Sequence, residues 1–339
     1  MRLPNPIGDT IMATPALRAL REHWPRTRLV AAGPGSGVAV LEGLPFLDEL
    51  VALPGRQAAG SAGLLAAANR LREQRFDLAL LFANSFSSAL MARLAGIPRR
   101  AGYVGGGRTP LLTDRVPAAP EHGFHRMPQP MVEFYFRLVE SVGVPRGSHR
   151  TQLVALPADD SKADAWLARH DLRAGTPLYG LHGGASFGPS KLWYPERWAA
   201  LADRLHERHG GRAILFCGPG EEDTVRAIAA AAKSPVASAA EDPIDLRTLK
   251  AIVKRLALIV ATDAGPRHFG PALGVPTVAL LGATDPRFSN TNLQRSLVVR
   301  TGVECSPCHL KVCPIDHRCM TRMSTEMVLA ACERLLAAR

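Results

Sequence analysis

Long hydrophobic runs are missing from this sequence of 339 residues. No apolar stretch reaches the ~18 residues that a transmembrane helix needs. The first ten residues, MRLPNPIGDT, contain no hydrophobic signal-peptide segment. We therefore expect the protein to stay in the cytoplasm. The hydrophobic fraction of 47% is still ample for a buried core, and at roughly 100–200 residues per domain the length indicates two domains.

Two common nucleotide-binding motifs are also absent. The sequence contains neither G-x-x-x-x-G-K-[ST] nor a G-x-G-x-x-G fingerprint after a first strand, which excludes P-loop NTPases and dinucleotide-dependent dehydrogenases. Aromatic residues make up only 6%, and the arginines are scattered, so we expect no nucleic-acid partner despite a net charge of +11. The basic balance instead favours an anionic membrane face or a phosphorylated substrate.

Strand-like and helix-like segments alternate along the chain and predict an α/β fold. An apolar strand is expected before the loop at residues 4–10, but only a strand end is visible there. In the first half, strands are predicted at 28–32, 50–53 and 77–82, and helices at 58–74, 89–94 and 130–142. In the second half, strands are predicted at 178–181, 213–217, 256–261 and 275–281, and helices at 195–209, 223–232 and 245–254.

This order predicts two Rossmann-like, doubly wound domains that face each other across a cleft. The first domain is expected to span residues 1–156 and the second residues 157–323, with residues 145–177 as the connection. The final amphipathic helix, within residues 324–339, is expected to pack back on the first domain.

Polar residues follow three strands of the second half, at the edge where α/β proteins bind ligands. They are Ser186 and Lys191, then Glu221 and Glu222, then Thr262, Asp263, Ala264, Gly265 and His268. A lysine, a carboxylate and the N–H groups of a helix N-terminus suit a nucleotide diphosphate, with Lys191 on phosphate and Glu221 or Glu222 on ribose. Asp263 is expected to cap the helix that begins there, and ordinary α/β packing is the alternative for this turn.

The first half offers one acid and a group of candidate acceptor-binding residues. Asp9 lies where a loop enters a helix, so a helix cap is the alternative to a chemical role. Pro15 is expected to kink that helix or delay its start. The candidate acceptor-binding residues are Asn84, Ser85, Arg99, Arg100, Arg108 and Arg126. For the four arginines, solvated surface positions are the commoner alternative.

Four cysteines stand close together near the end of the chain. Their spacing is Cys305-x2-Cys308-x4-Cys313-x5-Cys319, with His309 and His317 interleaved. This density suits a structural zinc or another metal, although the spacing is not that of a zinc ribbon. Reduced thiols in a family-specific loop and a disulfide pair are the alternatives, the latter disfavoured in a reducing cytoplasm.

Five segments together resemble the ADP-heptose:lipopolysaccharide heptosyltransferases, glycosyltransferase family 9, and the heptosyltransferase II type more closely. They are RLPNPIGDTIMATPALRALR, NSFSSALMARLAGIPRRAGY, GASFGPSKLWYPERW, TDAGPRHFGPALGVPTVALLGATDP and the late cysteine cluster. The resemblance implies a GT-B fold and inverting transfer of heptose from ADP-heptose. The implied acceptor is the lipopolysaccharide inner core or a lipid A precursor, at the cytosolic face of the inner membrane.

The resemblance also implies roles for individual residues. Asp9 corresponds to the proposed general base, Lys191 to the lysine on the diphosphate, and residues 262–268 to a phosphate loop. No metal is then required for catalysis. In one departure from the family pattern, Gly-Pro-Arg-His replaces the more usual Gly-Leu-Met-His and places Arg267 beside the site.

Two other functions fit the same sequence. One is a GT-B glycosyltransferase with another nucleotide sugar or glycan acceptor, because acceptor loops diverge freely. The other is a non-catalytic protein that binds a nucleotide sugar. A pure binder has no need of the carboxylate of Asp9, so the sequence favours catalysis.

Overall fold

The computed structural model describes residues 1–54, 60–117, 128–290 and 292–338, together with the backbone of residues 121–122 and 125–126. The chain divides into two compact units. The first comprises Met1–Gln152 with Arg287–Thr291, and the second Leu153–Pro286 with Asn292–Arg339. The division after Gln152 lies near the boundary expected after residue 156.

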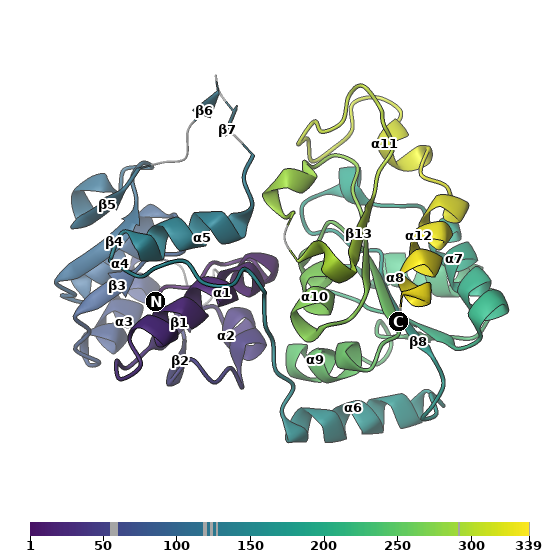
Figure 1. Cartoon of the computed structure of the whole chain (residues 1–339), viewed down its shortest axis with the longest axis horizontal. Helices are drawn as coiled ribbons and strands as arrows, with labels where there is room; N and C mark the ends of the chain where they lie inside the picture. The colour runs from purple at the N-terminus through teal and green to yellow at the C-terminus, as the bar shows by residue number, and fades with distance from the viewer. Residues whose placement is uncertain (55–59, 118–120, 123–124, 127, 291, 339) are drawn as a thin grey trace. The chain divides into compact units, whose positions relative to one another are not determined.

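The first unit is a parallel sheet covered by helices (Figure 1). Its strands are β1 (Val30–Gly33), β2 (Glu49–Ala52), β3 (Leu78–Leu80), β4 (Arg99–Tyr103) and β5 (Asp114–Val116), with a small antiparallel pair, β6 (Glu121–His122) and β7 (His125–Arg126). Its helices are α1 (Ile7–His23), α2 (Gly35–Leu41), α3 (Ser61–Arg72), α4 (Phe86–Leu94) and α5 (Met131–Glu140), with a 3-10 turn, η2 (Thr109–Leu111). Buried side chains of α3 and α4 pack with those of β1, β2 and β3 in a hydrophobic core of this unit.

The first residues of the chain join the two parts of this sheet. Arg2 forms parallel bridges to Ala32 in β1 and to Leu81 beyond β3. The N–H of Arg2 donates to the Leu80 carbonyl at 2.8 Å, and the N–H of Leu3 to the Ala32 carbonyl at 2.8 Å. The first strand that the sequence pattern lacked is therefore present as a bridge, too short to show as an apolar run. It anchors the loop that leads to Asp9.

Helix α1 begins at Ile7 and continues to His23 with Pro15 inside it. The expectation that Pro15 delays the start of this helix is therefore wrong. The proline is buried in the core-facing side of the helix, and α1 packs against α5.

The second unit contains a six-stranded parallel sheet in the order β10-β9-β8-β11-β12-β13. The strands are β8 (Leu178–His182), β9 (Arg212–Leu215), β10 (Val236–Ser238), β11 (Leu258–Thr262), β12 (Thr277–Leu280) and β13 (Ser296–Val299). This is the doubly wound order 3-2-1-4-5-6 of a Rossmann fold. The central strands β8 and β11 are buried along their whole length, which explains the apolar run that leads into and through β11.

Helices cover both faces of this second sheet. They are α6 (Pro157–Arg169), α7 (Pro195–His209), α8 (Glu222–Ala231), α9 (Leu246–Lys254), α10 (Phe269–Leu273), α11 (Arg318–Thr321) and α12 (Thr325–Ala337). Short 3-10 turns interrupt the loops: η3 (Pro189–Lys191), η4 (Gly265–His268) and η6 (Leu293–Arg295). A further turn, η5 (Pro286–Phe288), lies where the chain enters the segment 287–291 of the first unit. The core includes Trp193 and Trp198, whose rings meet edge to face at 5.1 Å.

The packing of two helices belongs to the second unit. Helix α12, expected to pack back on the first domain, packs against α7, β12 and β13 within the second unit (Figure 1). Its apolar side chains belong to the core of that unit. Helix α6, assigned to the connection, packs on α9, where Arg247 pairs with the buried Asp159 at 2.9 Å.

Membrane-spanning helices were not expected, and none of the helices in the described part of the chain has the length and hydrophobicity to cross a bilayer.

Candidate active site

The strand order of the second unit reverses between β8 and β11, and ligands of such sheets bind where the carboxyl ends of these two strands meet. The loop after β8 runs from Gly183 to η3, and the loop after β11 runs from Asp263 into η4. Thr262, predicted to bind the donor, donates its hydroxyl to the Gly184 carbonyl and so ties the two loops together. Ser186 lies exposed on the first of these loops.

Lys191 lies at the end of the first loop and reaches across to the second. Its Nζ donates to Asp263 Oδ2 at 2.6 Å and to the Asp263 carbonyl at 2.8 Å. The ring of Phe187 lies 4.7 Å from Nζ, within cation–π range. Only 10% of the lysine side chain is exposed. The ammonium group is thus held in one place by three contacts.

Asp263 is the centre of a charged cluster. Besides Lys191, its carboxylate accepts a hydrogen bond from Thr284 Oγ1 at 2.6 Å and pairs with Arg267 at 3.0 Å. Burial disfavours the charged carboxylate, but Arg267 and Lys191 outweigh it and hold the pKa of Asp263 well below its usual value. Two cations share one carboxylate, so the cluster carries one surplus positive charge.

The expected helix cap at Asp263 is corrected by this geometry. The residue before η4 is Ala264, with no side-chain cap, and the carboxylate of Asp263 is engaged by Lys191, Thr284 and Arg267 instead. The helical segment opens with the four residues of η4, which form 3-10 helix, and continues with the five residues of α10. The side-chain cations, more than a helix dipole, therefore make this edge positive.

His268 contributes no charge to this cluster near neutral pH. Burial, and then the nearby charge of Arg267, lowers the pKa of His268 to about 3. The imidazole is neutral and can exchange hydrogen bonds with a ligand. Positive charge for a diphosphate must come from Lys191 and Arg267.

The two glutamates after β9 differ in position. Glu221 Oε2 accepts a hydrogen bond from the Gly218 N–H at 2.8 Å and lies 3.8 Å from His182 Nε2. A Cβ atom at Gly184 would lie 2.0 Å from the Glu221 carboxyl carbon, so only glycine lets this carboxylate reach the loop after β8. Glu222 accepts from Gly220 in its own turn. Glu221 is therefore the glutamate at the switch point.

Asp9 lies in the first turn of α1 in the other unit. The residue before the helix is Pro6, so Asp9 is not the helix cap that was the alternative. Its carboxylate is half-buried, and it forms no hydrogen bond or ion pair with any residue in the described ranges. Burial raises the pKa of Asp9 to about 6, although a helix N-terminus by itself favours a carboxylate. A buried acid without a cation suits a general base.

The candidate acceptor-binding residues fall into two groups. The first group follows the carboxyl ends of two strands: Asn84 and Ser85 come after β3, and Arg108 comes after β4. Asp9 lies at this same edge of the sheet. Arg108 is buried and donates to the carbonyls of Tyr103 at 2.6 Å and Asn84 at 3.2 Å. Ser85 caps α4 by accepting from the Ser88 N–H at 3.2 Å. Arg108 and Ser85 thus stabilise the loops at this edge of the sheet.

Arg99 and Arg100 do not belong with that group. They begin β4 and so lie at the opposite edge of the sheet. Arg99 pairs with Asp114 at 2.6 Å, and Arg100 donates to the Leu111 carbonyl at 2.7 Å. The sequence did not show at which end of β4 these two arginines lie. Arg126 lies in β7, and its side chain is outside the described part of the structure.

The late cysteines are close to one another. All are free thiols, and burial together with the nearby Cys305, Cys308 and Cys313 raises the pKa of Cys319. Within the described ranges, no three or more His, Cys, Asp and Glu side chains form a group that could hold a metal ion. No role in the reaction is assigned to them.

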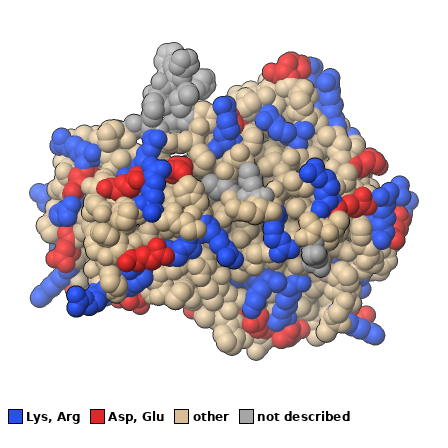
Figure 2. Space-filling view, viewed as in Figure 1, with Lys and Arg blue, Asp and Glu red and all other residues tan. Residues whose placement is uncertain are grey.

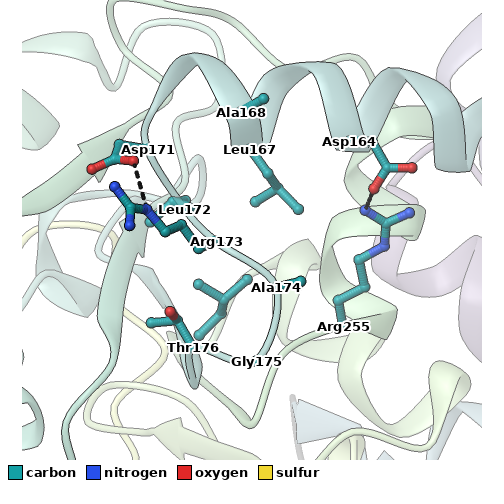
Figure 3. Close-up of a pocket in the computed structure, with 11 residues that line it drawn as sticks. Asp164, Leu167, Ala168, Asp171, Leu172, Arg173, Ala174, Gly175, Thr176 and Arg255 are labelled. Atoms are coloured by element: carbon teal, nitrogen blue, oxygen red, sulfur yellow. Dashed lines mark hydrogen bonds and ion pairs between the residues drawn. The ribbon is translucent and has the colours of Figure 1, made fainter.

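A pocket of about 710 Å³ lies at the other end of the second sheet, beside Leu178 where β8 begins (Figure 3). Its charged side chains are paired with one another, Arg255 with Asp164 and Arg173 with Asp171. Few polar groups are left to fix a ligand, and the pocket lies away from the carboxyl ends of the strands. We therefore place the site at the switch point.

The sequence missed Thr284, which follows β12 at the same edge. Position alone could have found it, since β12 lies next to β11 in the sheet and Thr284 comes shortly after its carboxyl end. Arg267 was noticed as an extra cation, but not as a partner of Asp263.

Known proteins resemble this chain over most of its length. The family model described as "Glycosyltransferase family 9 (heptosyltransferase)" matches residues 64–318. Lipopolysaccharide heptosyltransferase 2 of Escherichia coli K12 is 28% identical over 307 residues, which cover 88% of this chain and 86% of that protein.

Two solved structures share the fold over nearly the whole chain. A family 9 glycosyltransferase from Veillonella parvula has a TM-score of 0.83 at 23% identity, covering 100% of this chain and 96% of that one. The ADP-heptose lipopolysaccharide heptosyltransferase II of E. coli has a TM-score of 0.78 at 25% identity, covering 99% and 98%.

The two Rossmann-like units and the site at the switch point define a glycosyltransferase with the GT-B fold. The fold class and the resemblance noted in the sequence are thereby confirmed. The chain belongs to glycosyltransferase family 9, the heptosyltransferases.

Proposed function

We propose that this enzyme transfers heptose from ADP-heptose to the inner core of lipopolysaccharide, as a heptosyltransferase of the second type. Relatives named lipopolysaccharide heptosyltransferase 2 match along most of the chain. The observation that carries the proposal is the state of Asp9, a half-buried carboxylate whose pKa is raised to about 6. A protein that only bound a nucleotide sugar would have no use for such a group.

The reaction we propose is a direct displacement with inversion. The acceptor oxygen forms a bond to the anomeric carbon of the heptose, while the bond from that carbon to the diphosphate oxygen breaks. Asp9 takes the proton of the acceptor hydroxyl, and ADP leaves with the electron pair of the broken bond. Each unit thus has one chemical task.

The second unit would bind ADP at its switch point. Lys191 and Arg267, which both pair with Asp263, would stabilise the negative charge that develops on the departing diphosphate. Glu221 would accept hydrogen bonds from the ribose hydroxyls. Because these cations can stabilise the leaving group, we propose that transfer needs no metal cofactor, which unchanged turnover in a chelator would support. The structural zinc suggested by the cysteine spacing stays a separate prediction, tested by elemental analysis of the purified protein.

The test is transfer from ADP-heptose to a monoheptosylated or Kdo-bearing lipid A acceptor, with the wild type beside Asp9→Asn. We expect turnover in the wild type, and none in the variant, while ADP binding stays the same in both. A wild type that binds ADP but does not accept ADP-heptose as donor would indicate that this GT-B enzyme uses another nucleotide sugar. Binding without any transfer would refute an enzymatic role for Asp9.

We further propose that the enzyme works in the cytoplasm, at the inner face of the inner membrane, where a lipid-linked acceptor would be presented. The net charge of +11 supports attraction to anionic lipids. Lys and Arg are interspersed with Asp and Glu on the face seen in Figure 2, so we expect weak, salt-sensitive attachment. Sedimentation with anionic vesicles, compared with neutral vesicles, tests this; equal binding to both would contradict it.

A further inference from the structure

We propose that the loop of residues 309–317, between Cys308 and the start of α11, positions Lys191 for donor binding by holding Ser190. The inference rests on the proposed role of Lys191 as a ligand of the donor diphosphate. It assigns to part of the cysteine-rich segment a task that its unusual composition does not reveal.

Every polar group of Ser190 is bonded to this loop. The Ser190 N–H donates to the Lys311 carbonyl at 3.1 Å, and its hydroxyl donates to the Leu310 carbonyl at 2.6 Å. The Ser190 carbonyl accepts from His317 Nε2 at 2.8 Å, which requires the tautomer with the proton on Nε2. Ser190 is only 2% exposed, so water cannot readily replace these bonds. The residue that follows it is Lys191.

Gly188 lets the loop come this close. A Cβ atom at Gly188 would lie 2.5 Å from the Lys311 carbonyl oxygen, closer than real Cβ atoms come to backbone. Its φ of 153° is also in the range that favours glycine. Both the serine and the glycine before Lys191 are thus fitted to the same piece of backbone.

Apolar packing does not explain why the loop lies here. Leu310, Val312 and Ile315 are 46%, 65% and 56% exposed. The loop is held at its start by the Cys308 and His309 N–H groups, which donate to the Ala283 carbonyl at 3.1 and 2.8 Å. Its middle is attached to the segment of Lys191 by the hydrogen bonds of Ser190.

Lys191 is consequently fixed at both ends. Asp263 and Phe187 hold its ammonium group, while the 309–317 loop holds the backbone from which the side chain extends. Release of the loop would let η3 shift and would misplace the ammonium relative to a bound diphosphate. Ser190, Gly188 and His317 act through Lys191 and are positioning residues.

The first experiment compares ADP affinity, by calorimetry, in Gly188→Ala and Lys191→Ala. Gly302→Ala is the matched control, because a Cβ there meets no atom within 4 Å. We expect about a tenfold or greater loss of affinity in Lys191→Ala and in Gly188→Ala, as for a lost charge-assisted hydrogen bond, and none in Gly302→Ala. In the double variant Gly188→Ala/Lys191→Ala, the loss should not exceed that of Lys191→Ala alone, since both act on one contact.

The second experiment uses His317, whose backbone has a positive φ of 57°. His317→Gln keeps an N–H donor at the end of the side chain, and His317→Met removes it with the same backbone cost. ADP affinity should be retained in the Gln variant and reduced in the Met variant. This pair serves even if Gly188→Ala fails to fold.

The outcomes separate the two proposals. A wild type that does not bind ADP would refute the donor site itself. If the wild type binds ADP and Lys191→Ala weakens it, the positioning role is refuted by wild-type affinity in both Gly188→Ala and His317→Met. It is also refuted if the effects of Gly188→Ala and Lys191→Ala add fully. Unchanged melting temperatures would show that any losses do not come from unfolding.

Discussion

Replacing Asp9 with asparagine should raise the stability of this enzyme while it abolishes transfer. Burial raises the pKa of the Asp9 carboxyl from 3.8 to about 6. At about 1.36 kcal/mol per pKa unit, ionisation of this group costs the folded state about 3 kcal/mol at neutral pH. Asparagine has a similar shape and no charge, so it removes that cost together with the base.

The sign follows from linkage. A carboxyl whose pKa is higher in the folded state binds its proton more tightly there than in the unfolded chain. Its contribution to stability is therefore largest below pH 3.8 and is lost as the pH rises through about 6. Asp9→Asn should melt at a higher temperature than the wild type at pH 7.5, and the difference should shrink at pH 4.5.

Asp48 provides a control of opposite sign in the same unit. A hydrogen bond from the Leu29 N–H, and then the contact with Arg21, lowers the pKa of Asp48. Asp48→Asn should accordingly lower the melting temperature at pH 7.5. Activity should be unaffected.

The wild-type rate should show the same titration. If Asp9 must be ionised, kcat/KM should fall about tenfold for each pH unit below about 6. Calorimetric melting and initial rates between pH 4.5 and 8 measure both effects. A rate that stays level from pH 7 to pH 5, or an Asp9→Asn variant less stable than the wild type at pH 7.5, would refute the assignment of Asp9 as an unpaired buried base.

Further expectations concern the donor site. Lys191→Ala should weaken ADP binding by roughly 1.5–3 kcal/mol, as for a lost charge-assisted hydrogen bond, whereas Asp9→Asn should not; equal losses in calorimetry would contradict this division of roles. Gly184→Ala should displace the Glu221 carboxylate, and it should reduce the affinity for ADP more than the affinity for a diphosphate that lacks ribose. An equal loss of affinity for both ligands would argue against a contact between Glu221 and ribose. Because the pKa of His268 is lowered to about 3, the wild type should lose stability as the pH falls below 6.5, and His268→Gln should lose less; identical acid unfolding curves would show that His268 is not buried as a neutral group.

The sequence predicted helices and strands well where the pattern of neighbouring residues alone determines them. Helix α7 has the predicted bounds, because a proline at its first turn and an apolar face mark its extent. The central strand β11 was visible as an apolar run because both of its faces are buried. The strands β4, β5, β10 and β13 were not predicted, since β5, β10 and β13 are short edge strands with weak patterns and β4 begins with two arginines. The bridge at Arg2 has no pattern of its own.

The sequence predicted most of the residues of the candidate site, but not which of them contact one another. The rule that ligands meet the carboxyl ends of parallel strands brought Lys191 and Asp263 to one crevice. That rule did not show that they pair, because their contact joins residues far apart in the sequence. The sequence could not predict the hydrogen bonds from Ser190 to residues 310–317. Two of the three are made to backbone carbonyls of the loop, and every residue has such a carbonyl.

The two charged groups of the proposed reaction are treated in opposite ways, and the chemistry requires this. A general base must take up a proton during transfer, so its pKa has to lie near the working pH, and a counter-ion would lower it out of range. Asp9 is accordingly buried and has no cation among the described residues. The side chain of the proposed diphosphate-binding lysine is only 10% exposed, and a charge in such a place needs a partner of opposite sign. Asp263 supplies that partner. Because Arg267 shares the same carboxylate, the pair does not cancel the positive charge that a diphosphate would meet.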